Sequence, residues 1–131
     1  MAKGKTKAKY VDGFVLVVPK DKVAAYTKMA KEGAKMWLGF GALEYYECVG
    51  DDLAPNMGGA KILTFPELTK LKAGETAWFS FITYKSRAHR DSVNKKVMKD
   101  MDKNAEKYKD MAMPFDMTRM STGGFKVVVS G

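Results

Sequence analysis

The sequence predicts one small α+β domain within its 131 residues. Segments rich in β-branched and aromatic residues, which are typical of strands, alternate with two segments whose apolar residues recur at helical spacing. No internal repeat or linker divides the chain, and its length fits a single domain. We therefore expect one domain over residues 10–131, preceded by a disordered basic tail over residues 1–9.

The first half of the chain predicts a strand, a helix and a second strand. Residues 10–19 (YVDGFVLVVP) place apolar side chains on both sides of an extended chain, so both faces of this strand should be buried. Asp21 is the expected N-cap of a helix that runs to about Leu38. Residues 42–49 predict the next strand, and the Gly-, Pro- and Asp-rich residues 50–61 predict a loop.

The second half predicts two further strands and a second helix. Residues 62–65 form a short apolar segment that could be an extra edge strand. Residues 76–85 (TAWFSFITYK) predict a strand that is again largely apolar on both faces. Ser86 is then expected to cap a helix that reaches at least Met101, and residues 119–130 contain the last strand.

The resulting order, βαββαβ, is that of the ferredoxin-like fold, in which both helices cover one face of an antiparallel sheet. The other sheet face should then contact water, yet the strands at 10–19 and 76–85 carry apolar side chains on both faces. An apolar free face needs a cover, and a second copy of the chain is the simplest one. We therefore predict a homodimer.

The formal net charge of +8 favours contact with phosphates. Half of the excess comes from Lys3, Lys5, Lys7 and Lys9, and such a tail attracts nucleic acid without recognising its sequence. RNA binding is therefore an alternative to a tail that only aids solubility. No stretch approaches the roughly 18 apolar residues of a membrane span, and residues 10–19 make a poor signal peptide, so a cytoplasmic location is expected.

The sequence contains one cysteine, Cys48, and one histidine, His89. A lone cysteine suits a reducing compartment and forms no intrachain disulfide. We expect a buried and inert thiol, because the preceding residue, Glu47, offers no positive charge to activate it. With so few ligands and no glycine-rich phosphate motif, we predict neither a metal nor a cofactor.

The densest group of polar residues (YKSRAHRD) begins at Tyr84, where a strand is expected to meet a helix. The free N–H groups of a helix N-terminus, together with Ser86, Arg87 and Arg90, could bind an anion. His89 falls on the apolar stripe of the helix, so Tyr84 and His89 are the candidate catalytic acid/base pair. The alternative is a structural histidine in a capped helix whose arginines form salt bridges.

Three carboxylates lie within mostly apolar predicted strands, where their burial must be compensated. Glu44 and Glu47 point to opposite faces of one strand, so they cannot act as a pair. Asp12 and Glu44 join the candidate ligand-binding residues. The methionine-rich residues 111–120 predict a flexible loop that packs across the end of the domain or, alternatively, covers an apolar ligand.

Several segments, in the same order along the chain, carry a resemblance to a known family. They are YVDGF at 10–14, GALEY at 41–45, FSF at 79–81, YKSRAHRD at 84–91, VM at 97–98, MPFD at 113–116 and RM at 119–120. Over roughly residues 10 to 129 the chain resembles the YbaA-like family of small bacterial proteins. The resemblance implies a dimeric α+β barrel, in which two ferredoxin-like sheets face each other. It implies no activity, because the family is of unknown function.

Three functions follow as hypotheses. The first is a homodimeric small-molecule-binding protein or cofactor-free enzyme with a cleft between sheet and helices, which would take a small anionic or aromatic ligand. The second is an RNA-binding protein that uses the basic tail and the arginines of the second helix. The third is an interaction module without a ligand. A fully packed cleft would argue against the first.

Overall fold

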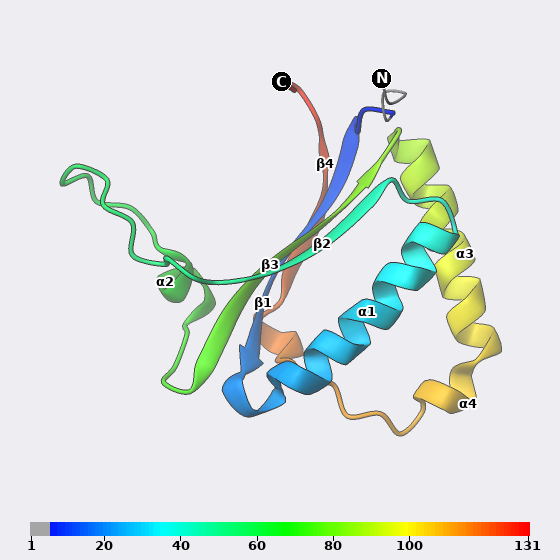
Figure 1. Ribbon diagram of the computed structural model, residues 1–131, viewed down its shortest axis with the longest axis horizontal. Helices are drawn as coiled ribbons and strands as arrows, with labels where there is room; N and C mark the ends of the chain where they lie inside the picture. The colour runs from blue at the N-terminus through cyan, green and yellow to red at the C-terminus, as the bar shows by residue number, and fades with distance from the viewer. Residues whose placement is uncertain (1–5) are drawn as a thin grey trace, which may run out of the picture.

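The computed structural model describes residues 6–131, which form an antiparallel sheet with helices packed on it (Figure 1). The strand order is β2-β3-β1-β4, and each neighbouring pair is antiparallel. The predicted α+β class is thereby confirmed. The strands are β1 (Tyr10–Pro19), β2 (Glu44–Val49), β3 (Glu75–Tyr84) and β4 (Ser121–Lys126).

Two long helices, α1 (Val23–Gly39) and α3 (Arg87–Lys103), lie on the same face of the sheet (Figure 1). The short helix α2 (Phe65–Thr69) lies on the other side and follows a long projecting loop (Figure 1). The remaining elements are the short helix α4 (Ala105–Tyr108) and the 3-10 turns η1 (Lys20–Lys22) and η2 (Met117–Arg119).

The core between the sheet and the two long helices has two clusters. In one, Trp78 of β3 meets Tyr26 of α1, with the ring centroids 4.9 Å apart and the rings edge to face. In the other, Tyr84 of β3 packs with Val93 and Val97 of α3, and all three are almost completely buried. The further buried members of the two clusters are Tyr10, Leu16, Val18, Ala30, Ala42 and Ile82.

The predicted elements agree with the structure where the sequence pattern is strongest. The first predicted strand is β1 with the same two end residues. Ser86 is the N-cap of α3, and its Oγ accepts a hydrogen bond of 3.0 Å from the backbone N–H of His89. The last strand lies within the predicted range, but it ends at Lys126, and Gly123 and Gly124 stay in regular register with β1.

Two local predictions are wrong. Asp21 does not cap α1, because the chain first makes the turn η1 and Lys22 then takes the N-cap position without a side-chain hydrogen bond. Residues 62–65 form no strand, because Thr64 begins helix α2 instead. The side chains of Thr64 and Glu67 form a reciprocal capping box, which satisfies backbone N–H groups at the start of the helix.

The sheet face opposite α1 and α3 is only partly covered. Helix α2 packs against β1 and β3 at one end of this face, where Val17 and Ala77 are buried. Beyond α2, the aromatic side chains of Tyr46, Phe79 and Phe125 remain 45%, 46% and 62% exposed. The apolar free face that the two-sided strands predict is therefore present. We call Tyr46, Phe79 and Phe125, together with the partly exposed Phe81, the open aromatic face.

Residues 1–5 of the predicted basic tail lie outside the described residues. At the other end of that tail, Lys9 is bonded to the sheet: its N–H donates to the carbonyl of Tyr84 (2.9 Å), and its carbonyl accepts from the N–H of Val127 (3.0 Å). None of the helices within residues 6–131 is both long and apolar enough to span a membrane.

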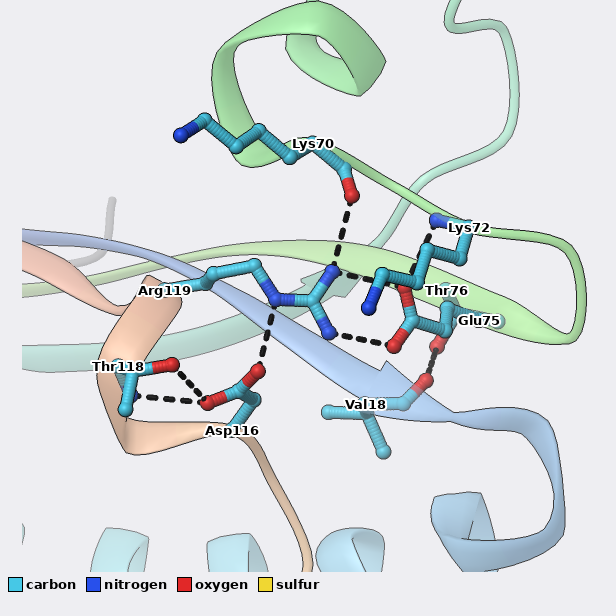
Figure 2. Close-up of polar contacts among 8 residues, drawn as sticks. All are labelled: Val18, Lys70, Lys72, Glu75, Thr76, Asp116, Thr118 and Arg119. Carbon is cyan, nitrogen blue, oxygen red and sulfur yellow. Dashed lines mark hydrogen bonds and ion pairs between the residues drawn. The ribbon is translucent and has the colours of Figure 1, made fainter.

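An ion-pair cluster anchors the segment that leads into β4 (Figure 2). The guanidinium of Arg119, in η2, donates hydrogen bonds to Glu75 at the start of β3 (2.8 Å and 2.5 Å), to Asp116 (2.7 Å) and to the carbonyl of Lys70 (3.0 Å). Asp116 also accepts a hydrogen bond from the backbone N–H of Thr118 (2.9 Å). We call this cluster the Arg119 anchor, and it fixes one end of the methionine-rich segment to the sheet.

Candidate ligand-binding cavity

A cavity of about 590 Å³ lies between the helix-covered face of the sheet and α1. Its third wall is the end of α3 with the methionine-rich segment that follows. Small-molecule sites in proteins commonly occupy roughly 300–1,000 Å³, so this volume suits a small ligand. The lining is mainly apolar and includes Met29, Met36, Trp37, Met111, Met113 and Phe115.

One polar cluster interrupts the apolar lining. The half-buried carboxylate of Glu47, on β2, accepts hydrogen bonds from the hydroxyls of Tyr26 (2.7 Å) and Tyr45 (2.8 Å). The hydroxyl of Ser80 donates a third hydrogen bond to the same carboxylate. We call these four residues the Glu47 cluster, and all four line the cavity.

The strand register and the helix position explain how the Glu47 cluster assembles. Glu47 on β2 is paired directly with Ser80 on β3, so their side chains leave the same face of the sheet. Tyr45 lies two residues before Glu47 and therefore shares that face. Tyr26 reaches the carboxylate from α1, and its ring is held edge to face against Trp78 and Phe115.

Electrostatics keep the two phenols in their protonated form. Burial raises the pKa of Tyr26 well above its usual range, and the hydrogen bond to Glu47 raises it further. Burial also raises the pKa of Tyr45, and the nearby charge of Glu47 adds to the shift. Both hydroxyls therefore remain donors to Glu47. A carboxylate at the wall of an apolar cavity can accept a hydrogen bond or a proton from a bound molecule.

The sequence contained only part of the signal for this cluster. Glu47 was predicted as a carboxylate within a mostly apolar strand, but the sequence pattern did not single out Ser80. The pairing of these two residues depends on the register between β2 and β3, which the pattern of each strand alone does not give. Tyr26 is a buried core residue of α1 whose hydroxyl also donates to Glu47, a role that helical spacing alone does not reveal.

The predicted acid/base pair lies outside the cavity. The rings of Tyr84 and His89 meet edge to face, with centroids 5.8 Å apart. Nδ1 of His89 accepts a hydrogen bond from the backbone N–H of Lys85 (2.9 Å), and the hydroxyl of Tyr84 lies 3.5 Å from the amide oxygen of Asn94. Burial raises the pKa of Tyr84, and the charge of Asp12 adds to this. The structure thus brings the pair together, while neither residue lines the cavity.

Two of the predicted ligand-binding residues contact each other. A guanidinium nitrogen of Arg90 lies 3.3 Å from the buried carboxylate of Asp12, and the guanidinium also stacks over the ring of Tyr10 at 5.1 Å. Burial raises the pKa of Asp12, while the positive charge of Arg90 opposes that shift. Both side chains therefore have partners within the protein.

Of the other three predicted ligand-binding residues, two lie at the start of α3 and one lies on the opposite face of the sheet. Ser86 is occupied as the cap of α3, and Arg87 is exposed with its Nε 4.0 Å from the carboxylate of Asp91. Glu44 lies on the sheet face away from the helices, where it accepts a hydrogen bond from the hydroxyl of Tyr46 (2.9 Å). Glu44 is therefore separated from the other predicted residues, whereas Ser86 contacts the backbone of His89, and Arg87 shares Asp91 with Arg90.

The prediction of a buried thiol at Cys48 is wrong. Cys48 is exposed rather than buried, because it lies on the edge strand β2 and on the sheet face away from α1 and α3. Within residues 6–131, no three side chains of His, Cys, Asp or Glu gather as the ligands of a metal ion would.

Comparisons with known proteins give a family but no activity. Residues 9–117 match the family described as "Protein of unknown function (DUF1428)". The chain is 40% identical over 123 residues to the uncharacterized protein YbaA of Escherichia coli strain K12, an alignment that covers 92% of this chain and 97% of that protein. The uncharacterized protein YbaA of Shigella flexneri matches with the same identity and coverage. The family resemblance inferred from the sequence is thereby confirmed, and the chain belongs to the DUF1428 family of proteins of unknown function.

Proposed function

We propose that this chain is a small-molecule-binding protein whose ligand occupies the cavity between the sheet and α1. The observation that carries the proposal is a space of about 590 Å³ in a domain of this size, lined by apolar side chains around one polar cluster. Protein interiors are normally packed with few voids larger than a water molecule. A large apolar space with a few converging polar groups is the usual form of a ligand site.

The methionine-rich segment is proposed as the adjustable wall of this site. Met111 and Met113 line the cavity although their side chains are 47% and 46% exposed, and residues 111–113 have no regular secondary structure. Methionine side chains are flexible and adapt to irregular apolar shapes. The Arg119 anchor holds one end of the segment, so the segment could close over a ligand without leaving the domain.

A binding experiment with a neutral fluorescent probe, N-phenyl-1-naphthylamine, tests this proposal. We expect the probe to gain fluorescence with the wild-type protein and to lose it with Ala30→Phe, because Ala30 lines the cavity and a larger side chain fills it. Ala25→Phe is the matched control, because Ala25 is exposed on the same helix and is not part of the lining.

Overpacking at Ala30 could cost about 1–3 kcal/mol, so circular dichroism must show that the variant is folded. Met29→Trp provides a second filling variant at a half-buried position of the lining. Probe binding that is absent from the wild type, or equal in the filling variants and the control, would exclude the cavity as the ligand site.

We also propose that two copies assemble through the open aromatic face, as the dimeric α+β barrel expected from the sequence, with each sheet following the ferredoxin-like plan. The exposed aromatic surface supports this, because large apolar patches on soluble proteins mark interfaces. Light scattering during size exclusion should give twice the chain mass for the wild type and the single mass for Phe79→Glu. A monomeric wild type at micromolar concentration would overturn the dimer.

A further inference from the structure

The Glu47 cluster offers a ligand only hydrogen-bond acceptors. The hydroxyls of Tyr26, Tyr45 and Ser80 each carry one proton, and each of these protons is directed to the Glu47 carboxylate. The indole N–H of Trp37, which also lines the cavity, donates to the amide oxygen of Asn94 at 3.1 Å. The three hydroxyls and the Glu47 carboxylate therefore present only oxygen lone pairs to the cavity.

Glu47 itself has room for one more donor. A carboxylate offers about four lone-pair sites on its two oxygens. Oε1 of Glu47 accepts from Tyr26 and Ser80, whereas Oε2 accepts only from Tyr45. The free site on Oε2 therefore suits a donor that belongs to the bound molecule.

The charge around the cluster is unbalanced. Within residues 6–131, no lysine, arginine or histidine forms an ion pair with Glu47. A carboxylate among apolar walls is costly unless it is paired or fully hydrogen-bonded, and a positive ligand would supply the missing charge. The other charged lining residues are exposed, and two of the three are acidic: Glu32, Asp102 and Lys109.

We infer that the ligand of this cavity is an organic ammonium ion, that is, an amine with an apolar or aromatic body. This inference rests on the proposed function of the cavity as a ligand site. The ammonium group donates one hydrogen bond to Oε2 of Glu47, and its other N–H groups reach the lone pairs of the neighbouring hydroxyls. The partly buried rings of Trp37 and Tyr45 line the same space, and aromatic rings attract a nearby cation. Carboxylates and phosphates are excluded, because they bring only acceptors and a charge like that of Glu47.

A matched ligand series tests the chemical class. 2-Phenylethylamine, 2-phenylethanol and 3-phenylpropanoate have nearly the same body and differ in their head groups. Each competes against the neutral probe N-phenyl-1-naphthylamine at neutral pH, where the amine is protonated. We expect the amine to bind at least about tenfold tighter than the alcohol, which corresponds to about 1.4 kcal/mol, and the carboxylate to be the weakest.

The variant Glu47→Gln keeps the size and an acceptor oxygen but removes the charge. We expect it to lose the preference for the amine over the alcohol, whereas Asp21→Asn, at an exposed position outside the lining, keeps that preference. If the probe fails to bind the wild type, the cavity proposal is lost together with this one. If the probe binds but the alcohol or the carboxylate competes as well as the amine, only the ammonium class is refuted. The wild-type series decides this even if Glu47→Gln fails to fold.

Discussion

Gly33 of α1 provides a way to disturb the Glu47 cluster without altering any of its four side chains. A Cβ atom at Gly33 would lie 2.9 Å from the hydroxyl oxygen of Tyr45, which is closer than carbon and oxygen atoms tolerate. Because the tyrosine side chain is the more adjustable partner, we expect Gly33→Ala to push its hydroxyl away from Glu47. The hydrogen bond of 2.8 Å between them would then weaken or break.

The expected change in the free energy of unfolding is the balance of two effects. Replacing glycine by alanine inside a helix stabilises a protein by about 1 kcal/mol. Losing a hydrogen bond to a charged group costs about 1.5–3 kcal/mol. Gly33→Ala should therefore destabilise the protein by about 0.5–2 kcal/mol, measured from the midpoint of urea unfolding at an unchanged slope.

Two further variants separate these effects. Gly39→Ala, at the end of the same helix, places its Cβ where no atom lies within 4 Å, so only the helical preference should act and the protein should gain up to about 1 kcal/mol. In a Tyr45→Phe background the nearest remaining ring atom would be 3.7 Å from the new Cβ at position 33, an ordinary contact. Gly33→Ala should then be stabilising. If it has the same effect with and without the Tyr45 hydroxyl, the proposed hydrogen bond contributes nothing and the reasoning is refuted.

Three other predictions concern residues outside the cavity lining. The hydrogen bonds from Arg119 lower the pKa of Glu75 from 4.5 to about 2. The ion pair between them therefore stabilises the fold above about pH 4.5, and this stabilisation is lost as the pH falls towards 2. Urea titrations should show that Arg119→Met makes stability depend less on pH over that range. Arg90→Met should cost about 3 kcal/mol or more, because it leaves the Asp12 carboxylate buried without a positive partner, and adding Asp12→Asn should restore part of the loss. Cys48 is paired with Phe79 and shares its sheet face, so in the monomeric Phe79→Glu variant it should react with a thiol reagent at a rate close to that in urea. The proposed dimer covers this face and should slow the reaction in the wild type, whereas protection in the monomeric variant would contradict the exposed position of Cys48.

The fold was largely predictable because its strongest elements carry local signals. The strand β1 is a dense run of β-branched and aromatic residues, and Ser86 caps α3 in the expected way. The error at residues 62–65 came from an apolar run that outweighed a capping signal. Thr64 and Glu67 stand at the spacing of a capping box, with Pro66 between them, and this pattern predicts a helix start.

The site was less predictable, because a cavity depends on the volume that packing leaves empty. The dense polar residues near Tyr84 predicted a site at the start of α3. There, however, the polar groups satisfy one another: Arg90 contacts Asp12, and Ser86 is used as the cap. The roles of His89 and Tyr84 as an acid/base pair remain a prediction. The Glu47 cluster is dispersed over α1, β2 and β3, so no single segment of the sequence reveals it.

The origin of the cavity lies in the small residues of α1. Ala30 and Gly33 are one helical turn apart and line the cavity, at positions where a helix packed on a sheet would normally bury larger side chains. Tyr26 precedes them on the same face, with its ring in the core beside Trp78 and its hydroxyl on Glu47. On this face of α1, the large side chain of Tyr26 fills the core, whereas the small residues Ala30 and Gly33 leave the space of the cavity. Substitutions that enlarge residues 30 or 33 should consequently affect ligand binding before they unfold the domain.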